Sequence, residues 1–331
     1  MLISPKNTTS LLEEDIILLL NSIGDTENPE FLQKKEKLPD EALVESFKEL
    51  TDYSLESTSA AIIETANKIQ NQINTQYVLV SLPRGGTHAG IGIKYVLKQN
   101  FGQDVSHYSI SMLKGVGIDA YALDYVIQKH QNPFIVFVDG WVGKGELAHE
   151  LRRAIADYEK SKQTSLQHLC AVISDPYETA NISGTHAELF MPESLMGATI
   201  SGLVSRSGNL HDLSYHFTRE YTEWQAQDFT NWYIQRVKDA IDKNPLYVFH
   251  TPLDFEQVTS YIHSHHGLES KDAYFGAAEV HRSIVRKHPS KIILRDKNHP
   301  LASPLLISAA QKNIPIVEDV NLPLFSVASK K

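Results

Sequence analysis

The chain has 331 residues, of which 42% are hydrophobic and 21% charged, so it is long enough for two globular folding units. Its net charge of −9 argues against a protein that coats nucleic acid without sequence preference. A single cysteine, Cys170, excludes an internal disulfide, and no apolar run is long enough to cross a bilayer. Met1–Asp15 lacks the basic-then-apolar order of a secretion signal, so we expect a cytoplasmic protein without membrane contact.

The charge is distributed unevenly along the chain. From Pro245 to the end there are 10 Lys and Arg against 8 Asp and Glu, a balance of +2. Residues 1–244 contain 21 against 32, a balance of −11. Any nucleic-acid contact is therefore expected in the C-terminal part.

The first quarter of the chain is predicted to be helical. Leu11–Leu20 and Asp40–Leu50 carry apolar residues at helical spacing, and Ser54–Ile73 continues the pattern. We expect residues 1–75 to form a helical extension of the domain that follows.

From Tyr77 onward, short apolar runs alternate with helix-like segments. The strand-like runs begin at Tyr77, Phe134 and His168 and are apolar on both faces. This alternation is typical of a parallel α/β sheet with helices on either side. We assign residues 76–243 to this domain.

A smaller α/β unit is predicted at residues 246–331, after a turn at Asp242–Pro245. Its strand-like runs are Leu246–His250, Lys291–Asp296 and Ile314–Asp319, and helix-like segments separate them.

Two glycine-containing loops follow predicted strands, where open parallel sheets bind their ligands. In the first, Ser81–Thr87, the paired glycines Gly85 and Gly86 expose backbone N–H groups that can hold a phosphate. Arg84 adds a positively charged fork for pyrophosphate oxygens. A plain strand-to-helix turn that needs glycine for backbone reasons would show the same residues.

The second loop, Val136–Glu146, places Asp139 at the end of a buried strand and opens a helix. A carboxylate there can accept hydrogen bonds from two ribose hydroxyls, while loop N–H groups hold a 5′-phosphate. Asp139 could instead only cap the turn. Both loops at strand ends of one sheet favour a shared phosphate-handling function.

Four segments in this order, HYSISMLKGVGID, FVDGWVGKGEL, AVISDPYETA and GATISGLVSRS, resemble the StiP-type phosphoribosyltransferase family associated with tellurium-resistance gene clusters. The resemblance covers most of residues 1–240 and implies a type I phosphoribosyltransferase-like parallel sheet. It implies a transferase that binds phosphoribosyl diphosphate or a nucleotide and transfers or removes a base-like group at the anomeric carbon. Mg²⁺ would be held through the substrate diphosphate. The alternative is a non-catalytic, RNA-binding ribonucleotide sensor.

The resemblance also assigns site residues. Asp139, Arg84 and Lys144 would act in catalysis, although Gly140 follows Asp139 where ordinary members have a second acidic residue. The substrate contacts would come from Pro83, Gly85, Gly86, Thr87, Lys114, Gly140, Trp141, Val142, Gly143, Gly145, Asp175, Ser205 and Arg206. For three of these the residue type has a plainer explanation: an exposed surface lysine at Lys114, a turn at Asp175, and a strand end at Arg206.

The same family has also been labelled a cysteine protease. Cys170 lies inside the strand-like HLCAVISD, where cysteine usually serves as a small buried hydrophobe. A nucleophile needs exposure and a positioned base, and the sequence identifies neither, so we do not expect proteolysis. His263–His266 precedes Gly267 at a predicted helix end, where histidine suits the helix dipole, so no metal site is expected there.

Phe275–Arg282 resembles the Gly-x-Asn-Glu-x-x-Lys loop of Pelota and related kink-turn RNA-binding domains, and the resemblance extends to the end of the chain. It implies a small α/β/α domain that binds structured RNA through Gly276, Glu279, Arg282, Arg286 and Lys287. Ala278 replaces the Asn that contacts a base edge, so phosphate contacts are expected to dominate. The fold could instead be retained for protein contact, which includes assembly of a homo-oligomer.

Overall fold

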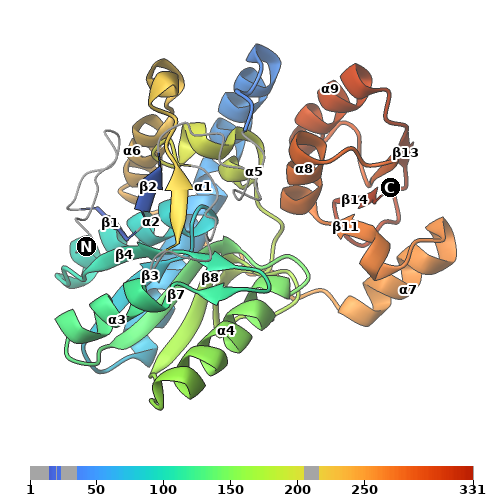
Figure 1. Ribbon diagram of the computed structural model, residues 1–331. Coiled ribbons are helices and arrows are strands. Elements are labelled where there is room, and N and C mark those ends of the chain that lie inside the picture. Colours follow the sequence, from blue (N-terminus) through green and yellow to red (C-terminus); the bar gives the residue numbers. More distant parts are fainter. Residues whose placement is uncertain (1–14, 20, 24–35, 205–215, 331) are drawn as a thin grey trace.

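The computed structural model describes residues 15–19, 21–23, 36–204 and 216–330. These residues form a larger and a smaller α/β domain that lie against each other (Figure 1). None of the described helices combines the length and the apolar character that crossing a bilayer requires.

The larger domain is built on a six-stranded sheet in which every neighbouring pair is parallel. In spatial order its strands are β1 (Ile17–Leu19), β4 (His107–Ile110), β3 (Tyr77–Ser81), β7 (Phe134–Trp141), β8 (His168–Ser174) and β9 (Ile182–Thr185). The predicted parallel α/β sheet is therefore confirmed. Strands β3 and β8 are apolar on both faces because helices cover each face.

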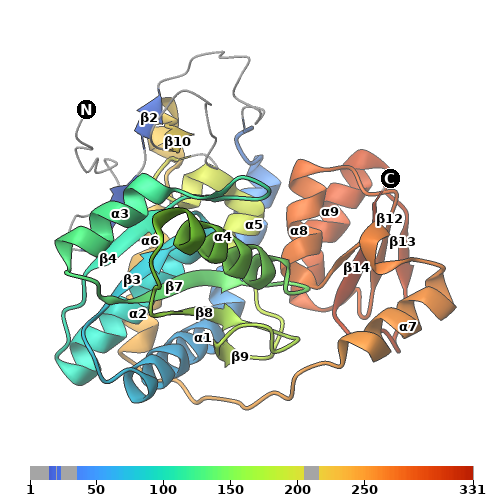
Figure 2. The same cartoon turned by 60° about the horizontal axis from the view of Figure 1, so that its bottom comes forward.

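Two layers of helices sandwich this sheet (Figure 2). On one face Val136 and Val138 of β7 share a core with a first group of helices. On the other face Ile135 and Phe137 pack against the remaining two helices. The first group is α1 (Glu41–Gln72), α2 (Gly85–Phe101) and α6 (Thr230–Ile241), and the second is α3 (Ala120–Lys129) and α4 (Glu146–Lys162).

Short elements complete the larger domain. The pairs β5 (Met112–Leu113) with β6 (Gly117–Ile118) and β2 (Asn21–Ile23) with β10 (Phe217–Arg219) form small ribbons beside the main sheet. After β9, the chain forms the five-residue helix α5 (Pro192–Met196) and the 3₁₀ helix Gly197–Ile200.

The helical prediction for the N-terminal extension is partly wrong. Within Leu11–Leu20, the described residues form strand β1, which pairs with β4 and buries Leu18 and Leu19. A short apolar run suits a helix or a strand equally, and the open sheet edge decided between them. Downstream, the two predicted helical segments are one 32-residue helix, α1, whose N-cap Asp40 accepts a hydrogen bond from Leu43 N at 2.9 Å.

The smaller domain has a four-stranded mixed sheet in the order β11, β14, β12, β13. Helices α8 and α9 pack on one face, and α7 packs on the other. Its elements are α7 (Phe255–His266), β11 (Ala273–Phe275), α8 (Ala277–Arg286), β12 (Lys291–Leu294), α9 (Ser303–Lys312), β13 (Ile316–Glu318) and β14 (Ser326–Ser329). The layers match the predicted α/β/α order, while a likeness to Pelota stays a prediction.

The connection between the domains, residues 245–254, contains neither helix nor strand. The predicted strand at Leu246–His250 is therefore wrong. Leu246, Val248 and Phe249 are 84%, 63% and 70% exposed, since the small sheet takes all its strands from later segments.

Helices α8 and α9 lie at the boundary between the domains (Figure 1). Helix α8 contacts α5, and α9 contacts α1. The core continues across the boundary, where the Phe190 ring lies 6.1 Å from the His281 ring of α8. One end of α8 therefore faces the C-terminal edge of the large sheet.

Candidate active site

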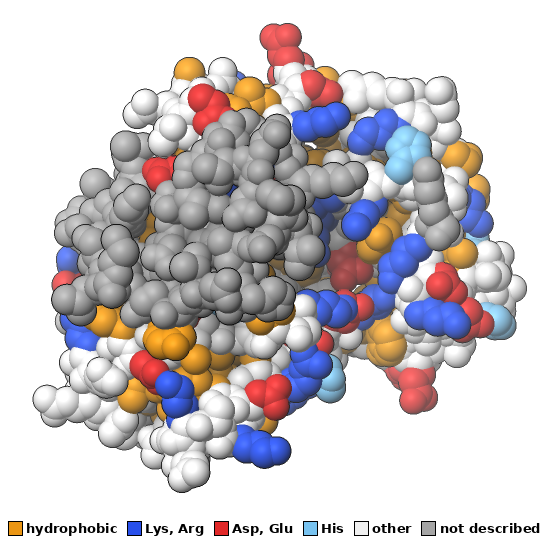
Figure 3. Space-filling model, viewed as in Figure 1, with side chains coloured by type: hydrophobic (Ala, Val, Ile, Leu, Met, Phe, Trp, Pro, Cys, Tyr) orange, Lys and Arg blue, Asp and Glu red, His pale blue; other side chains and the backbone are white. Residues whose placement is uncertain are grey.

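A cleft of about 320 Å³ lies between the two domains at the C-terminal edge of the large sheet. Its walls come from the loops after β3 and β7, the start of α4, the β5–β6 hairpin, α5 and α8. We call this the interdomain cleft. Figure 3 shows Lys and Arg side chains on the face of the molecule where the domains meet.

Arg84, from the first glycine-containing loop, lines the cleft but is buried and paired. Its Nη1 lies 2.8 Å from Glu36 Oε1 and also donates to Val204 O at 3.3 Å. The glycines beside it permit close packing of the loop against β7. A Cβ at Gly86 would lie 2.2 Å from Val138 O, and Thr87 is buried in the first turn of α2. The predicted ligand contacts of Gly85, Gly86 and Thr87 stay predictions. The same holds for Pro83, which lies on the cleft wall.

Asp139 reaches the cleft from β7, where its Oδ1 accepts a hydrogen bond from Gly140 N at 2.7 Å. Burial raises the pKa of Asp139 well above its ordinary value, and the nearby Glu193 raises it further. A Cβ at Gly85 would lie 2.2 Å from Asp139 Oδ1 and 3.0 Å from Glu193 Oε1. Both carboxyl groups therefore lie beside Gly85, on the side where a Cβ would be, and we call them the carboxyl pair.

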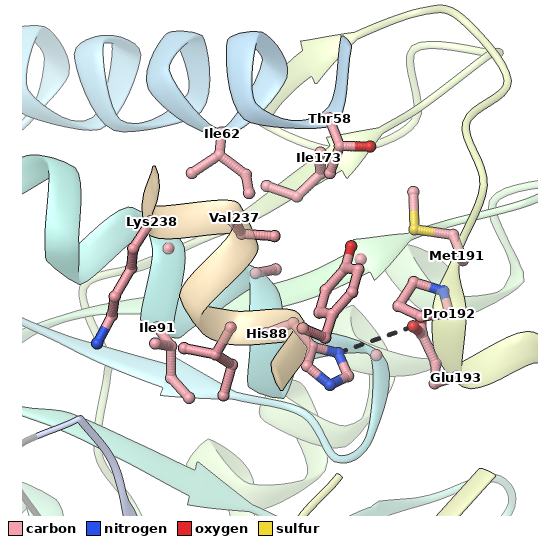
Figure 4. Close-up of a pocket in the computed structure, with 16 residues that line it drawn as sticks. Thr58, Ile62, His88, Ile91, Ile173, Met191, Pro192, Glu193, Val237 and Lys238 are labelled. Atoms are coloured by element: carbon pink, nitrogen blue, oxygen red, sulfur yellow. Dashed lines mark ion pairs between the residues drawn. The ribbon is translucent and has the colours of Figure 1, made fainter. Parts of the chain in front are cut away.

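Glu193, the second member, comes from α5 and is 5% exposed. Burial raises its pKa to about 7. His88 Nδ1 lies 3.9 Å from Glu193 Oε2, beside a small cavity of about 20 Å³ (Figure 4). Burial lowers the pKa of His88 to about 4, and its Nε2 bonds Ile200 O, so the neutral ring presents an acceptor at Nδ1 toward Glu193.

Lys144, the other basic residue predicted to act in catalysis, joins the two domains. Its Nζ donates to Ser270 O at 2.7 Å and to Ala273 O at 3.1 Å, and burial lowers its pKa. Glu279 lies beside the same loop, since a Cβ at Gly143 would be 2.7 Å from Glu279 Oε1. Protein groups thus surround the loop at the position where a phosphate was predicted.

The remaining predicted contacts of the larger domain differ in their surroundings. Trp141 and Val142 line the cleft, and Lys114 lies at its rim, 3.0 Å from Glu146. Asp175 is buried and accepts from Thr179 N and Ala180 N at 2.6 and 2.7 Å, as a turn residue does. Gly145 begins α4 with φ +84, a backbone conformation that favours glycine. Ser205 and Arg206 lie outside the described residues.

The predicted RNA-contacting loop is held against the larger domain. Glu188 Oε1 accepts from Ala277 N at 2.8 Å, and Glu188 Oε2 accepts from Phe325 N at 2.5 Å. A Cβ at Gly276 would lie 2.7 Å from Glu188 Oε1. Gly276 and Glu279 therefore lie against protein groups, and RNA binding through them stays a prediction.

The basic residues of α8 point in different directions. Arg282 and Arg286 line the interdomain cleft, whereas Lys287 is exposed outside it. Arg282 lies close enough to the carboxyl pair to lower the pKa of both members against the larger effect of burial. RNA binding by these three residues stays a prediction.

Cys170 lies in the sheet, away from the cleft. It pairs with Phe137, whereas Asp139 pairs with Val172, so Cys170 is two residues nearer the opposite edge. The side chain is 5% exposed within the core beneath α3 and α4. Burial raises the pKa of its thiol to about 12, helped by the negative charges of Asp139 and Asp175. Among the described residues, no hydrogen bond joins this thiol to a histidine.

The predicted Mg²⁺ can be compared with the acidic groups present. Within the described residues no group of three or more His, Cys, Asp or Glu side chains could hold a metal. The carboxyl pair offers two carboxylates, the number that Mg²⁺ uses when a substrate supplies further oxygens. Mg²⁺ binding through a substrate diphosphate stays a prediction.

Sequence reasoning missed Glu193, His88 and Glu188. Glu193 follows Met191-Pro192, which looks like an ordinary helix start with Pro at the first position and an acid in the first turn. His88 lies within an apolar helix pattern. Only the packing of α5 against α2 and β7 shows that these side chains meet.

Solved phosphoribosyltransferases show only weak structural similarity to this chain. The hypoxanthine phosphoribosyltransferase from Trypanosoma cruzi is 13% identical, covers 52% of this chain and 90% of its own, and has a TM-score of 0.31. A hypothetical protein from Neisseria gonorrhoeae with bound ppGpp is 11% identical, covers 64% and 99%, and has a TM-score of 0.28. Scores this low support no argument about function.

Sequence comparisons give a more definite result. A curated relative, "Cysteine protease StiP" from Acinetobacter baylyi, is 28% identical over 285 residues, which are 79% of this chain and 73% of the relative. The model of the family described as "Tellurite-like stress resistance cysteine protease StiP" matches residues 13–238. These names overturn the predicted transferase, and its ribonucleotide-sensor alternative, in favour of a hydrolase. The resemblance to StiP is confirmed without the phosphoribosyltransferase activity attached to it, and the chain belongs to the StiP family.

Proposed function

We propose that this chain hydrolyses peptide bonds, in keeping with the names of its family and relative, and that the carboxyl pair activates the water. The observation that carries the proposal is that Asp139 Oδ1 and Glu193 Oε1 both lie beside Gly85, 2.2 and 3.0 Å from where its Cβ would be, on the wall of the interdomain cleft. Burial raises the pKa of both carboxyls, and the charge of Glu193 raises that of Asp139 further, so in this proposal the pair retains one proton near neutral pH.

A pair that shares one proton can act as base and acid in a single hydrolysis. The ionised carboxylate takes a proton from water as the water oxygen bonds to the peptide carbonyl carbon. The protonated carboxyl then gives its proton to the amide nitrogen as the C–N bond breaks. His88, whose acceptor nitrogen faces Glu193, helps to keep the shared proton at this end of the cleft.

The geometry favours this route over attack by the thiol. A cysteine nucleophile must be ionised and reach the substrate. Cys170 is buried, its pKa is raised to about 12, and it lies on the α3 and α4 side of the sheet. We therefore assign the hydrolysis of the peptide bond to the carboxyl pair and not to the thiol of Cys170.

A comparison of three variants tests the proposal. With quenched-fluorescence peptide mixtures, Asp139→Asn and Glu193→Gln should each lower kcat/KM by at least ~100-fold, the scale of general acid–base catalysis. Cys170→Ala should retain activity, and iodoacetamide should leave the wild type active. Circular dichroism checks that each variant is folded. Loss of activity in Cys170→Ala with activity kept in Asp139→Asn would refute the proposal, as would absence of peptide hydrolysis by the wild type.

A further inference from the structure

We infer that Arg282, with Arg286 beside it on α8, binds an acidic group of the substrate next to the carboxyl pair, so that α8 of the C-terminal domain forms part of the active site. The inference rests on the proposed peptide hydrolysis and names its substrate class, peptides with an anionic side chain next to the cleaved bond. Neither the family description nor the relative's name assigns these arginines a role.

Two arginines of α8 share the interdomain cleft with the carboxyl pair. Arg282 and Arg286 are four residues apart on α8, so their side chains leave the same face of the helix. Both line the interdomain cleft together with Asp139 and Glu193. The carboxyl pair comes from β7 and α5 of the larger domain, so the cleft is incomplete without the smaller one.

Several charged side chains around the cleft have partners within the protein. Arg84 is paired with Glu36, and Lys114 is paired with Glu146. Glu150 lies 3.0 Å from Arg153, and Glu279 accepts a hydrogen bond from Phe275 N at 3.0 Å. For Arg282, in the part of the chain that the structure describes, no carboxylate lies within ion-pair distance. An exposed guanidinium beside two carboxyls that share a proton is available to an anion from outside.

Helix α8 is held in place against the larger domain. Glu188 accepts hydrogen bonds from Ala277 N at the start of α8 and from Phe325 N. Lys144 binds Ser270 O and Ala273 O just before this helix. These contacts fix the distance between α8 and the carboxyl pair, which positions Arg282 to orient a substrate as well as to attract it.

The ligand chemistry follows from the guanidinium group. Its planar fork binds carboxylates and phosphates with two parallel hydrogen bonds. A Glu side chain or a phosphoserine in a peptide would supply the same kind of anion, so the two sources need separate arms in the test.

The test uses the full-length protein and three peptides that differ at one position, Gln, Glu or phosphoserine. We expect the wild type to prefer an anionic peptide over the Gln peptide by at least ~10-fold in kcat/KM, the scale of one charged hydrogen bond. Arg282→Ala should abolish this preference and Arg282→Lys should restore part of it. Lys287→Ala, an exposed cation one residue beyond Arg286 that does not line the cleft, is the matched control and should keep the preference.

Calorimetry separates this inference from the proposed hydrolysis. Asp139→Asn should bind the anionic peptide more tightly than the Gln peptide, and the double variant with Arg282→Ala should not. If anionic peptides bind through Arg282 but the wild type does not hydrolyse them, the hydrolysis proposal fails and the binding site stands. Hydrolysis that requires Asp139 but is equal for the three peptides, with no effect of Arg282→Ala, overturns the inference. A preference for the Gln peptide overturns it as well.

Discussion

Ionisation of Glu193 should destabilise the folded protein at neutral and alkaline pH, so Glu193→Gln should stabilise it there. Burial raises the pKa of this carboxyl from 4.5 to about 7. Between these two values the folded protein holds a proton that the unfolded chain has already released. The free energy of unfolding therefore falls as the pH rises through this window, and the loss is complete above about pH 7.

The size of the effect follows from the pKa shift. A rise from 4.5 to about 7 in a side chain that is 5% exposed corresponds to about 3 kcal/mol. Glutamine has nearly the same volume and no charge, and it also removes the repulsion that raises the pKa of Asp139. We expect wild type and Glu193→Gln to have similar stability at pH 4 and to differ by up to about 3 kcal/mol at pH 8.

Urea unfolding, followed by circular dichroism at one-unit steps between pH 4 and pH 8, measures this difference. Glu49→Gln, at an exposed position on the same domain, controls for a general effect of removing one carboxylate. Stability curves that stay parallel across this range would show that Glu193 has the same pKa in the folded and the unfolded protein. That result would remove the basis for a carboxyl pair that shares a proton.

Two further predictions concern packing. Gly86→Ala should lower the free energy of unfolding by ~1–3 kcal/mol in urea because its Cβ would lie 2.2 Å from Val138 O. Gly92→Ala, whose Cβ would meet only the Ile62 side chain at 3.1 Å, should change stability much less. Glu188→Gln should speed hydrogen exchange at the amides of Ala277 and Phe325, since one of the two N–H groups would then face an NH₂ group. Unchanged exchange would mean that Glu188 does not hold the domains together.

The central sheet was predictable from the sequence because its strands are apolar on both faces. The predicted strand starts at Tyr77, Phe134 and His168 are the first residues of β3, β7 and β8. Strand β1 was not predictable, because a three-residue strand has too few positions to show a period of two. Its conformation depends on pairing with β4, which lies some ninety positions further along the chain.

The candidate site was only half predictable. Asp139 could be located because a carboxylate at the end of a buried strand in a parallel sheet reaches the ligand edge. Glu193 could not, since nothing in the local sequence of α5 distinguishes a buried carboxyl from an exposed one. Its burial depends on the packing of α5 against segments that precede it by more than fifty residues.

The misleading prediction arose because residue types do not reveal which charges remain unpaired. Arg84 and Lys144 have the chemistry of phosphate-binding residues, and a glycine-containing loop surrounds each of them. In the folded chain Glu36 pairs with Arg84, while the carbonyls of Ser270 and Ala273 bind Lys144. These partners come from outside the loops, in part from the other domain, so local motifs cannot indicate them. In the described part of the chain, the carboxyl pair and Arg282 are among the groups that face the cleft, and their combination favours acid–base chemistry on an anionic substrate.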